Sequence, residues 1–433
     1  MTPAALPRRL DRAEAFFWFL DRVSSMNFAV IAEGRGTLTD AAVRAALDAA
    51  QRRHPLLRVS IAADVERRLS FVPAPHAPIP YARCADADWR DELAERLVQP
   101  FALDTAPLAR AWRFARDDDG GWVLALVLHH SIGDARSAFA VLDEILQGAA
   151  GLPPAGDDIA PRAPLTDLYP AHVTGDAGRQ LGEQMKVARK ALAERIGLPE
   201  PQAGHGAPTG RLQPRLRSLR FDAAQTAALA DKARAVGATV NGLIGAAQLI
   251  ALRRLFGDAT PRTLGLTCAA DLRPYLSAPM DAATPGFYVT LVSSIQRVGD
   301  ADELWPLAQR LNGAIRQQLQ SGAAHLLYDF MPPAERFAPD AEGVAAFAQL
   351  MTRGVQTSLL SNAGRLAALP ALPGLVVEAR SFALCPTPTQ PVFLAVATDA
   401  GGMTLNLNHN TAQLDAGAAD AVLAGVRELL LAA

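Results

Sequence analysis

The amino-acid sequence predicts a mixed α/β fold made of two units, and three observations support that class. First, the chain has 433 residues, which at roughly 100–200 residues per domain favours two domains and leaves room for a third. Second, segments typical of strands and of helices alternate along both halves. Third, two loop-like stretches, Gly148–Pro164 and Gly197–Pro214, lie near the middle of the chain. We therefore predict one domain over residues 1–175 and a second over residues 176–433.

The elements of the first half follow from hydrophobic spacing and from turn residues. Alanines recur at helical intervals after Thr39 and Asp40, either of which can cap a helix. Two apolar segments flank the turn Asp117–Gly121, an arrangement typical of a hairpin. The predicted helices are residues 10–22, 38–53 and 135–146, and the predicted strands are residues 28–32, 54–61, 108–115 and 122–130.

The second half opens with a polar helix and then resumes the alternation. No sequence repeat relates it to the first half, although the two are similar in size and content. The predicted helices are residues 177–196, 223–236, 240–256, 301–320 and 415–432, and the predicted strands are residues 216–221, 263–269, 287–298, 375–383, 391–398 and 402–408.

Composition excludes several classes of protein. Half of the residues are hydrophobic and 20% are charged, which is enough for a packed core and unlike a disordered chain. Lys and Arg number 42 against 44 Asp and Glu, a balance that argues against a nucleic-acid-binding protein. No apolar run approaches the ~18–20 residues of a membrane helix, and charges interrupt the N-terminal segment where a signal peptide needs an apolar stretch. We expect a cytoplasmic protein with no membrane span.

The three cysteines, Cys84, Cys268 and Cys385, lie far apart in the sequence. None belongs to a CxxC pair, so the sequence indicates neither a disulfide framework nor a zinc site. We interpret all three as small buried hydrophobic residues.

One local pattern carries chemistry, the run His129–Asp134 at the end of the predicted strand 122–130. Consecutive strand residues face opposite sides, so only one of His129 and His130 can point into a given cleft. Gly133 permits a tight reversal, and Asp134 stands where the next helix begins. A neutral imidazole at a cleft can act as a general base near neutral pH.

Two other interpretations of this pattern stay open on local grounds. The histidines could be satisfied core groups, with Asp134 acting only as a helix cap. Alternatively, His and Asp could ligate a metal ion, although no other cluster of His, Cys or Glu lies nearby in the sequence.

The run His129–Asp134 resembles the HHxxxD motif of the chloramphenicol-acetyltransferase-like superfamily of acyltransferases. Further segments resemble that superfamily in the expected order and span nearly the whole chain. They are Leu10–Arg12, Met26–Phe28, Arg53–Arg58, Pro100–Leu103, Pro107–Leu108, Thr239–Asn241, Asp271–Pro274 and Ser361–Arg365. The chain length and the SNxG segment at Ser361 are most similar to polyketide-associated acyltransferases and to free-standing nonribosomal peptide condensation domains.

The resemblance implies a fold and a set of site residues. Two chloramphenicol-acetyltransferase-like subdomains would form a V-shaped pseudo-dimer, with the active site in a tunnel at their junction. His130 would be the catalytic base, supported by His129 and Gly133. Asp134 would be architectural and would pair with Arg273 of the second half. Ser361 and Asn362 match a segment that reaches towards the tunnel, so they are candidate substrate contacts.

The resemblance also implies the substrates. The donor would be an acyl thioester on the phosphopantetheine arm of an acyl carrier protein or on coenzyme A, and the acceptor would be a small alcohol or amine. It implies no resident cofactor and no metal, and we expect a monomer with no nucleic-acid partner. Because a thioester is already activated, no covalent acyl-enzyme is needed; consistently, the sequence has no GxSxG nucleophile elbow.

Three functions therefore compete. The first is an acyltransferase that forms an ester in polyketide, lipid or other secondary metabolism. The second is a discrete condensation enzyme that joins a carrier-bound acyl group to an amine or an alcohol. The third is a degenerate, non-catalytic recruitment domain, against which the two retained histidines argue.

The sequence departs from the family pattern at two places. Ala135 stands where the family usually has glycine, a change that matters only if that backbone needs a positive φ. Pro285–Val289 matches the corresponding condensation-domain segment only loosely, which favours ester formation over peptide-bond formation. The DFGWG signature of the plant BAHD branch is absent, which argues against that branch.

Overall fold

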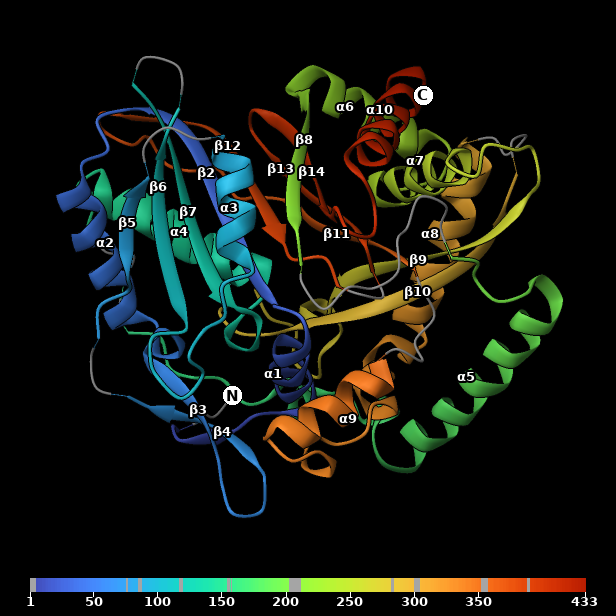
Figure 1. Ribbon diagram of the computed structural model, residues 1–433, viewed down its shortest axis with the longest axis horizontal. Helices are drawn as coiled ribbons and strands as arrows, with labels where there is room; N and C mark the ends of the chain where they lie inside the picture. The colour runs from blue at the N-terminus through green and yellow to red at the C-terminus, as the bar shows by residue number, and fades with distance from the viewer. Residues whose placement is uncertain are drawn as a thin grey trace.

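The computed structural model describes residues 5–433 except for 75–76, 85–87, 117–119, 154–155, 157, 202–211, 282–283, 300–303, 352–356 and 388–389. Its strands form a five-stranded sheet, a six-stranded sheet and a small three-stranded sheet. The two large sheets stand beside each other and splay apart, with helices on their outer faces (Figure 1). The fold is therefore mixed α/β with two sheet-bearing lobes, as the sequence predicts.

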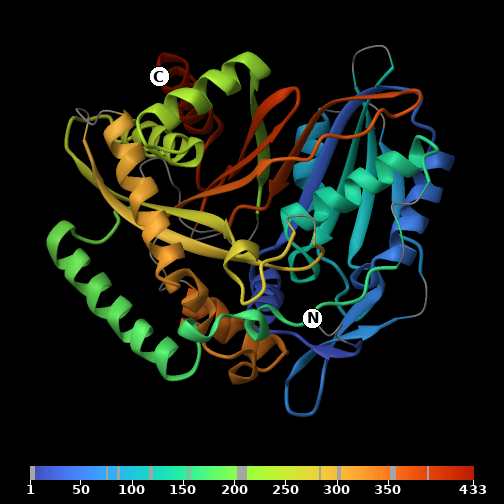
Figure 2. The same ribbon diagram turned by 180° about the vertical axis from the view of Figure 1, so that it is seen from behind.

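The first lobe is built on the five-stranded sheet, in the order β12-β2-β7-β6-β5. Figure 2 shows helix α4 lying across one face of this sheet. The strands are β2 (Asn27–Gly36), β5 (Tyr81–Cys84), β6 (Ala109–Ala115), β7 (Gly121–His129) and β12 (Leu375–Leu384), and the helices are α2 (Asp40–Arg53), α3 (Trp89–Leu97) and α4 (Ala135–Ala149). The predicted hairpin is confirmed by the antiparallel pairing of β6 with β7. Part of its turn, residues 117–119, lies outside the described residues.

The second lobe is built on the six-stranded sheet, in the order β10-β9-β11-β13-β14-β8. Its helix α7 (Val240–Arg254) is buried over most of its surface, in keeping with its nearly continuous apolar sequence. The strands are β8 (Pro214–Asp222), β9 (Arg262–Asp271), β10 (Val289–Val298), β11 (Ser358–Arg365), β13 (Val392–Asp399) and β14 (Gly402–Asn410), and the other helices are α6 (Ala223–Ala235), α8 (Leu304–Gln320) and α10 (Ala416–Ala432).

The remaining elements lie along the lower side of the molecule in the view of Figure 1. Helix α1 begins after Asp11, whose side chain accepts a hydrogen bond from the Glu14 backbone. These elements are β1 (Arg8–Arg9), α1 (Arg12–Val23), β3 (Val59–Ala63), β4 (Leu69–Pro73), α5 (Gly175–Ile196) and α9 (Ala341–Met351). Three 3-10 segments, η4 (Ala171–Val173), η6 (Ala323–Phe330) and η7 (Ala334–Arg336), complete this region.

The predicted domain division at residues 175 and 176 fails to account for β12. This strand belongs to the second part of the sequence, yet it pairs antiparallel with β2, from Leu375 opposite Gly36 to Leu384 opposite Phe28. The buried hydrophobic residues of the two lobes also form one continuous cluster. The lobes therefore share both a strand and a core.

Local predictions failed where short elements depend on tertiary pairing. Residues 54–61 do not form one strand; a 3-10 turn over Pro55–Arg58 precedes β3, because proline suits the first position of a helical turn. The short strands β1, β4 and β5, the longer strand β11 and the helices α3 and α9 were not predicted. Of the cysteines, Cys268 and Cys385 are buried as expected, whereas Cys84 is only half-buried.

In the described part of the chain, no single helix has both the length and the apolar character needed to cross a membrane. Helices α6 and α7 meet those criteria only when taken together, and they are bent by 97° relative to each other.

Candidate active site

The HHSIGD motif joins the last residue of β7 to the first turn of α4. β7 ends at His129, and His130–Ile132 form a single 3-10 turn. Asp134 is the N-cap of α4, where its side chain accepts a hydrogen bond from the Ser137 amide. The predicted strand was thus one residue too long, and His130 projects from the turn rather than from the sheet.

His130 lies on the wall of a cavity of about 1540 Å³ that residues of both lobes line. The aromatic rings of Phe17, Phe28 and Phe287 surround its imidazole, with ring centroids at 4.4, 4.8 and 5.5 Å. Nδ1 of His130 is buried without a hydrogen-bond partner. Burial lowers the pKa of His130 to about 4, against the opposing effects of its backbone surroundings and of the Asp134 charge. The imidazole is therefore neutral at physiological pH.

His129 points away from the cavity and is fully buried. Its Nδ1 accepts a hydrogen bond of 3.1 Å from the Ser131 amide, so the ring proton lies on Nε2. That nitrogen faces the Asp21 carboxylate of α1 at 3.6 Å. Ser131 Oγ in turn donates to the Glu14 carbonyl at 2.7 Å. His129 and Ser131 therefore hold the turn that carries His130 against α1.

Asp134 and Arg273 form the buried ion pair that the resemblance implied. One Arg273 Nη atom lies 3.0 Å from Asp134 Oδ2, and both side chains are almost completely shielded from solvent. Asp134 also accepts hydrogen bonds from the Ser137 amide at 2.9 Å and from the Tyr288 amide at 3.0 Å. Burial alone would raise the pKa of Asp134, but Arg273 and these hydrogen bonds hold it below its usual value. The helix-cap and ion-pair interpretations of Asp134 are thus both correct.

The segment around Gly286 closes this arrangement from the second lobe. The Gly286 carbonyl accepts hydrogen bonds from Ser137 Oγ at 2.6 Å and from the Asp134 amide at 3.3 Å. Arg273 stacks over the Tyr288 ring, 4.6 Å from its centroid, and donates to Asp271 at 2.9 Å. Pro285–Val289 therefore docks the HHSIGD motif through its backbone, which explains how its side chains could diverge from the family pattern.

Gly133 does not supply the tight reversal expected of it. Its φ of 175° is extended backbone that any residue adopts, and a Cβ there would make only ordinary contacts with Ser137 and Gly286. Ala135 is the first residue of α4 and has helical geometry, so the glycine usual in the family is not required at that position. The turn is formed by the 3-10 segment before Gly133 instead.

The structure separates the two candidate residues of the SNxG segment. Both lie on β11, but only Ser361 lines the cavity. The Asn362 side chain accepts a hydrogen bond of 2.8 Å from the Gly364 amide, at a point where the register with β13 shifts. Gly364 has a φ of 77°, a conformation that favours glycine. Asn362 therefore shapes a β-bulge rather than the cavity wall.

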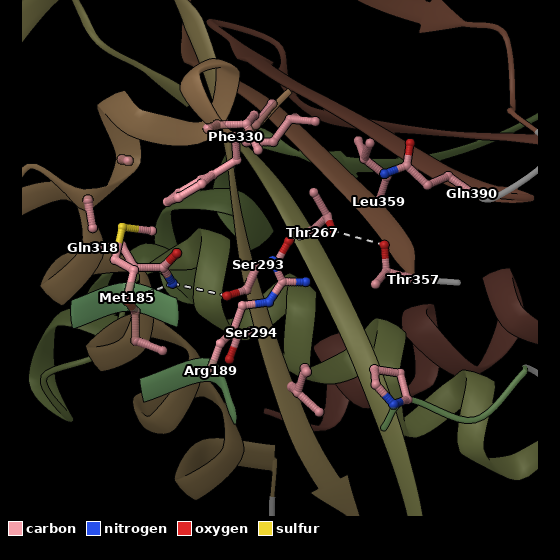
Figure 3. Close-up of a pocket in the computed structure, with 18 of the residues that line it drawn as sticks. Met185, Arg189, Thr267, Ser293, Ser294, Gln318, Phe330, Thr357, Leu359 and Gln390 are labelled. Carbon is pink, nitrogen blue, oxygen red and sulfur yellow. Dashed lines mark hydrogen bonds between the residues drawn. The ribbon is translucent and has the colours of Figure 1, made fainter. Parts of the chain in front are cut away.

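The cavity runs from His130 to the space beneath α5 and is mostly apolar near the motif. Figure 3 shows its polar end, where Ser293 and Ser294 of β10, Thr267 of β9 and Thr357 lie near Arg189 of α5. The Thr267 hydroxyl is 3.0 Å from the Ser293 hydroxyl and 2.9 Å from that of Thr357. In the described residues, no group of three or more His, Cys, Asp or Glu side chains is placed to hold a metal ion.

Sequence reasoning missed the aromatic residues around His130. Phe17 comes from α1, Phe28 from β2 and Phe287 from the segment before β10, so no local pattern relates them. Phe28 and Phe287 do lie within segments that the family resemblance marks, Met26–Phe28 and Pro285–Val289. Long-range contact with the imidazole is their common property, and only the fold reveals it.

The sequence matches two protein families. The condensation domain matches residues 16–261, more than half of the chain, and the phthiocerol/phthiodiolone dimycocerosyl transferase C-terminus matches residues 210–407. The probable nonribosomal peptide synthetase CymA of Salinispora arenicola is 29% identical over 291 residues. Cyclosporin synthetase simA of Tolypocladium inflatum is 29% identical over 168 residues. The matches cover 60% and 36% of this chain but only 4% and 1% of those much longer proteins.

Solved structures share the fold over nearly the whole chain. Polyketide synthase associated protein 5 from Mycobacterium tuberculosis is 18% identical with a TM-score of 0.61, covering 99% of this chain and 98% of its own. Trichothecene 15-O-acetyltransferase TRI3 from Fusarium sporotrichioides is 15% identical with a TM-score of 0.72, covering 98% and 95%. The X-domain from teicoplanin biosynthesis, in complex with OxyB, is 21% identical with a TM-score of 0.59, covering 100% and 94%.

Proposed function

The chain belongs to the condensation-domain family of acyltransferases, and on that premise we propose that it transfers an acyl group from a thioester to a hydroxyl acceptor, with His130 as general base. The donor is an acyl group on the phosphopantetheine of a carrier protein or on coenzyme A. The observation that carries this proposal is the position of the His130 imidazole on the wall of a cavity that residues of both lobes line.

The reaction follows from a neutral imidazole and an activated donor. His130 Nε2 takes the proton of the acceptor hydroxyl as its oxygen attacks the thioester carbonyl carbon. The tetrahedral intermediate expels the thiolate, which takes the proton back from His130, so that an ester and a free thiol leave. A low pKa weakens the base but keeps nearly every enzyme molecule in the reactive, neutral form. Holding both substrates in one cavity accelerates the reaction further, because the reacting groups are already close together.

The other motif residues act by positioning this imidazole. Both oxygens of Asp134 are engaged by Arg273, Ser137 and Tyr288, so its charge reaches His130 only through space. His129 holds the turn that carries His130. Ser361, at the cavity wall, is the candidate for a contact with substrate.

An amide-forming condensation enzyme is the second candidate. It is supported by the match to the condensation domain over the half of the chain that carries the motif, whereas the match to the dimycocerosyl transferase C-terminus supports the ester-forming candidate. The same base would serve both candidates. They therefore differ only in whether the acceptor is an amine or a hydroxyl.

The proposal is tested with intact-protein and product mass spectrometry. Acyl-loaded carrier protein and acyl-coenzyme A are each offered with a panel of alcohols and amines. We expect ester products with wild type, and turnover of His130→Ala reduced by about 10²–10⁴-fold, the range for loss of a positioned base. His172→Ala, an exposed histidine outside the cavity, is the matched control and should keep full activity.

Three outcomes would change the assignment. Products formed only with amines would establish the condensation candidate. Turnover of His130→Ala within about twofold of wild type would remove His130 from the mechanism. Failure of every donor and acceptor, together with stable binding of a partner protein, would favour the recruitment domain.

A further inference from the structure

Helix α5 crosses the cavity as a strap held at its two ends. It stands away from the second sheet in both views (Figures 1 and 2). Its first turns pack on η4 and η6, where Gly178 approaches the Val173 carbonyl closely. At its other end, Thr263 Oγ1 donates to the Ile196 carbonyl at 2.6 Å. Between these anchors, the inner side of α5 faces the cavity rather than a packed core.

The inner side of α5 combines apolar side chains with the cationic side chain of Arg189. Leu181, Met185 and Leu192, spaced at helical intervals on one face, all line the cavity. Apolar side chains that face water lose the favourable free energy of burial. The row of Leu181, Met185 and Leu192 therefore favours an apolar ligand beneath α5. Arg189 lies on the same side, one turn after Met185, and also lines the cavity.

The charge of the cavity has one sign. The charged side chains that line it, among the described residues, are all cationic: Lys186, Arg189, Arg195, Arg297 and Arg310. The whole chain, in contrast, has a net charge of −2. Cations gathered on the walls of a concave, partly apolar site focus their field on its interior and attract anions.

Arg189 is the cation best placed to bind such an anion. In Figure 3 its side chain points from α5 into the cavity, towards the strand that carries Ser293 and Ser294. No carboxylate of the described residues pairs with it, whereas the α5 cations Lys186 and Lys190 pair with Glu183 and Glu194 at 2.6 and 4.0 Å. The linked hydroxyls of Ser293, Thr267 and Thr357 provide neutral donors on the opposite wall.

From this arrangement we infer that the space beneath α5 binds an amphipathic anion, a molecule with an apolar body and a carboxylate or phosphate group that Arg189 holds. A guanidinium donates two parallel hydrogen bonds to either group, and the hydroxyls of Ser293, Thr267 and Thr357 can donate to its remaining oxygen lone pairs. The inference rests on the proposed function in one respect, namely that this molecule is one of the two substrates. The acid group belongs either to the substrate itself or to the phosphates of coenzyme A or phosphopantetheine.

Calorimetric titration tests the inference without requiring turnover. The probes are octanoate, octyl phosphate and 1-octanol, which share one chain, together with coenzyme A. Wild type should bind at least one anionic probe about tenfold or more tightly than octanol, and Arg189→Gln should remove that preference, as expected for one charge-assisted hydrogen bond. Lys190→Gln is the matched control, because Lys190 lies on α5 but does not line the cavity.

The outcomes separate the sources of the anion from each other and from the catalytic proposal. Octanoate or octyl phosphate binding that weakens in Arg189→Gln supports an acid group on the substrate. Weakened binding of coenzyme A alone supports a donor phosphate. Equal binding of octanol and the anions, or unchanged affinities in Arg189→Gln, would overturn the inference. Because binding is measured without a thioester, an inactive enzyme would leave this result intact.

Discussion

Three aromatic rings, rather than a carboxylate, surround the His130 imidazole. Phe17, Phe28 and Phe287 make its surroundings apolar, and burial is the main cause of its lowered pKa. The nearest motif carboxylate, that of Asp134, is engaged by Arg273. The site therefore favours a base that stays neutral over a wide pH range.

This arrangement predicts an unusual acid limb. The pKa of His130 falls from 6.5 to about 4, so kcat/KM should stay flat from neutral pH down to about pH 5 and decline only near pH 4. Protonation is disfavoured in the folded state, so the unfolded chain binds more protons between pH 4 and 6.5, and stability falls as pH drops through that window. A pH–rate profile with acid-stable substrates checks the first statement. An acid limb near pH 6.5 would contradict it.

The Asp134–Arg273 pair predicts a coupled loss of stability. Arg273→Ala leaves the Asp134 charge buried without a cation, which costs on the order of 3–5 kcal/mol, whereas Asp134→Ala leaves Arg273 paired with Asp271 and should cost less. Because the second substitution removes that orphaned charge, the double variant should be less destabilised than the sum of the singles. Urea unfolding of all three variants measures the coupling. Arg254→Ala, which removes an exposed pair with Glu428, is the control, and strict additivity in the buried pair would disprove the coupling.

At the residue scale, the sequence predicted the roles of those residues that belong to a recognisable motif. The HHSIGD motif, the cap at Asp134 and the partner Arg273 could be named in advance, because family resemblance marks them directly. Gly133 and Asn362 were assigned wrongly because their roles depend on backbone geometry and register. The aromatic residues around His130 come from three separate segments, so no spacing could connect them.

At the scale of elements, strand β12 illustrates what local pattern cannot decide. Its apolar character predicted a strand, but nothing in the segment indicates which sheet it joins. Long-range partners settle that choice: Arg380 of β12 donates to both oxygens of Asp143 of α4, at 2.9 and 2.7 Å. Its other guanidinium end donates to the Ala367 carbonyl at 2.6 Å. The short strands β1, β4 and β5 escaped prediction for the same reason.

The Arg380 contact predicts a marked loss of stability on substitution. Arg380 is 3% exposed and Asp143 is half-buried, so Arg380→Ala leaves a partly shielded carboxylate without its cation and should cost about 2–3 kcal/mol, the range for hydrogen bonds to charged groups. Arg35→Ala removes a more exposed pair with Glu378 between β2 and β12 and should cost at most about 1 kcal/mol. Thermal unfolding measures both. Similar Tm shifts in the two variants would show that β12 is not anchored through Arg380.

At the scale of the whole molecule, the cavity that both lobes line has a volume of about 1540 Å³, more than the ~300–1,000 Å³ of an ordinary small-molecule pocket, as the proposed reaction between two substrates requires. Cys385 lines it, but burial raises the pKa of that thiol far above its ordinary value, so it stays protonated and is a poor nucleophile. Direct transfer in a ternary complex is therefore the expected route.

Kinetics of the complete reaction test that route. Initial-rate plots with both substrates varied should intersect, and no acylated protein should accumulate when donor is supplied alone. Cys385→Ala should retain turnover, because the thiol forms no covalent bond with the acyl group. Parallel initial-rate plots, or an acyl adduct that acceptor chases to product, would instead establish a covalent intermediate.

The shared strand also limits how such proteins can be recombined. Consider a chimera with a single breakpoint that joins the first lobe of this chain to the second lobe of a relative. Its β12 would come from the relative, so β2 would pair with a strand of foreign sequence. An ill-fitting or missing edge strand leaves unpaired backbone groups that invite aggregation. A workable exchange of lobes in this fold therefore needs two further crossovers, one on each side of residues 375–384, so that the strand travels with the sheet it completes.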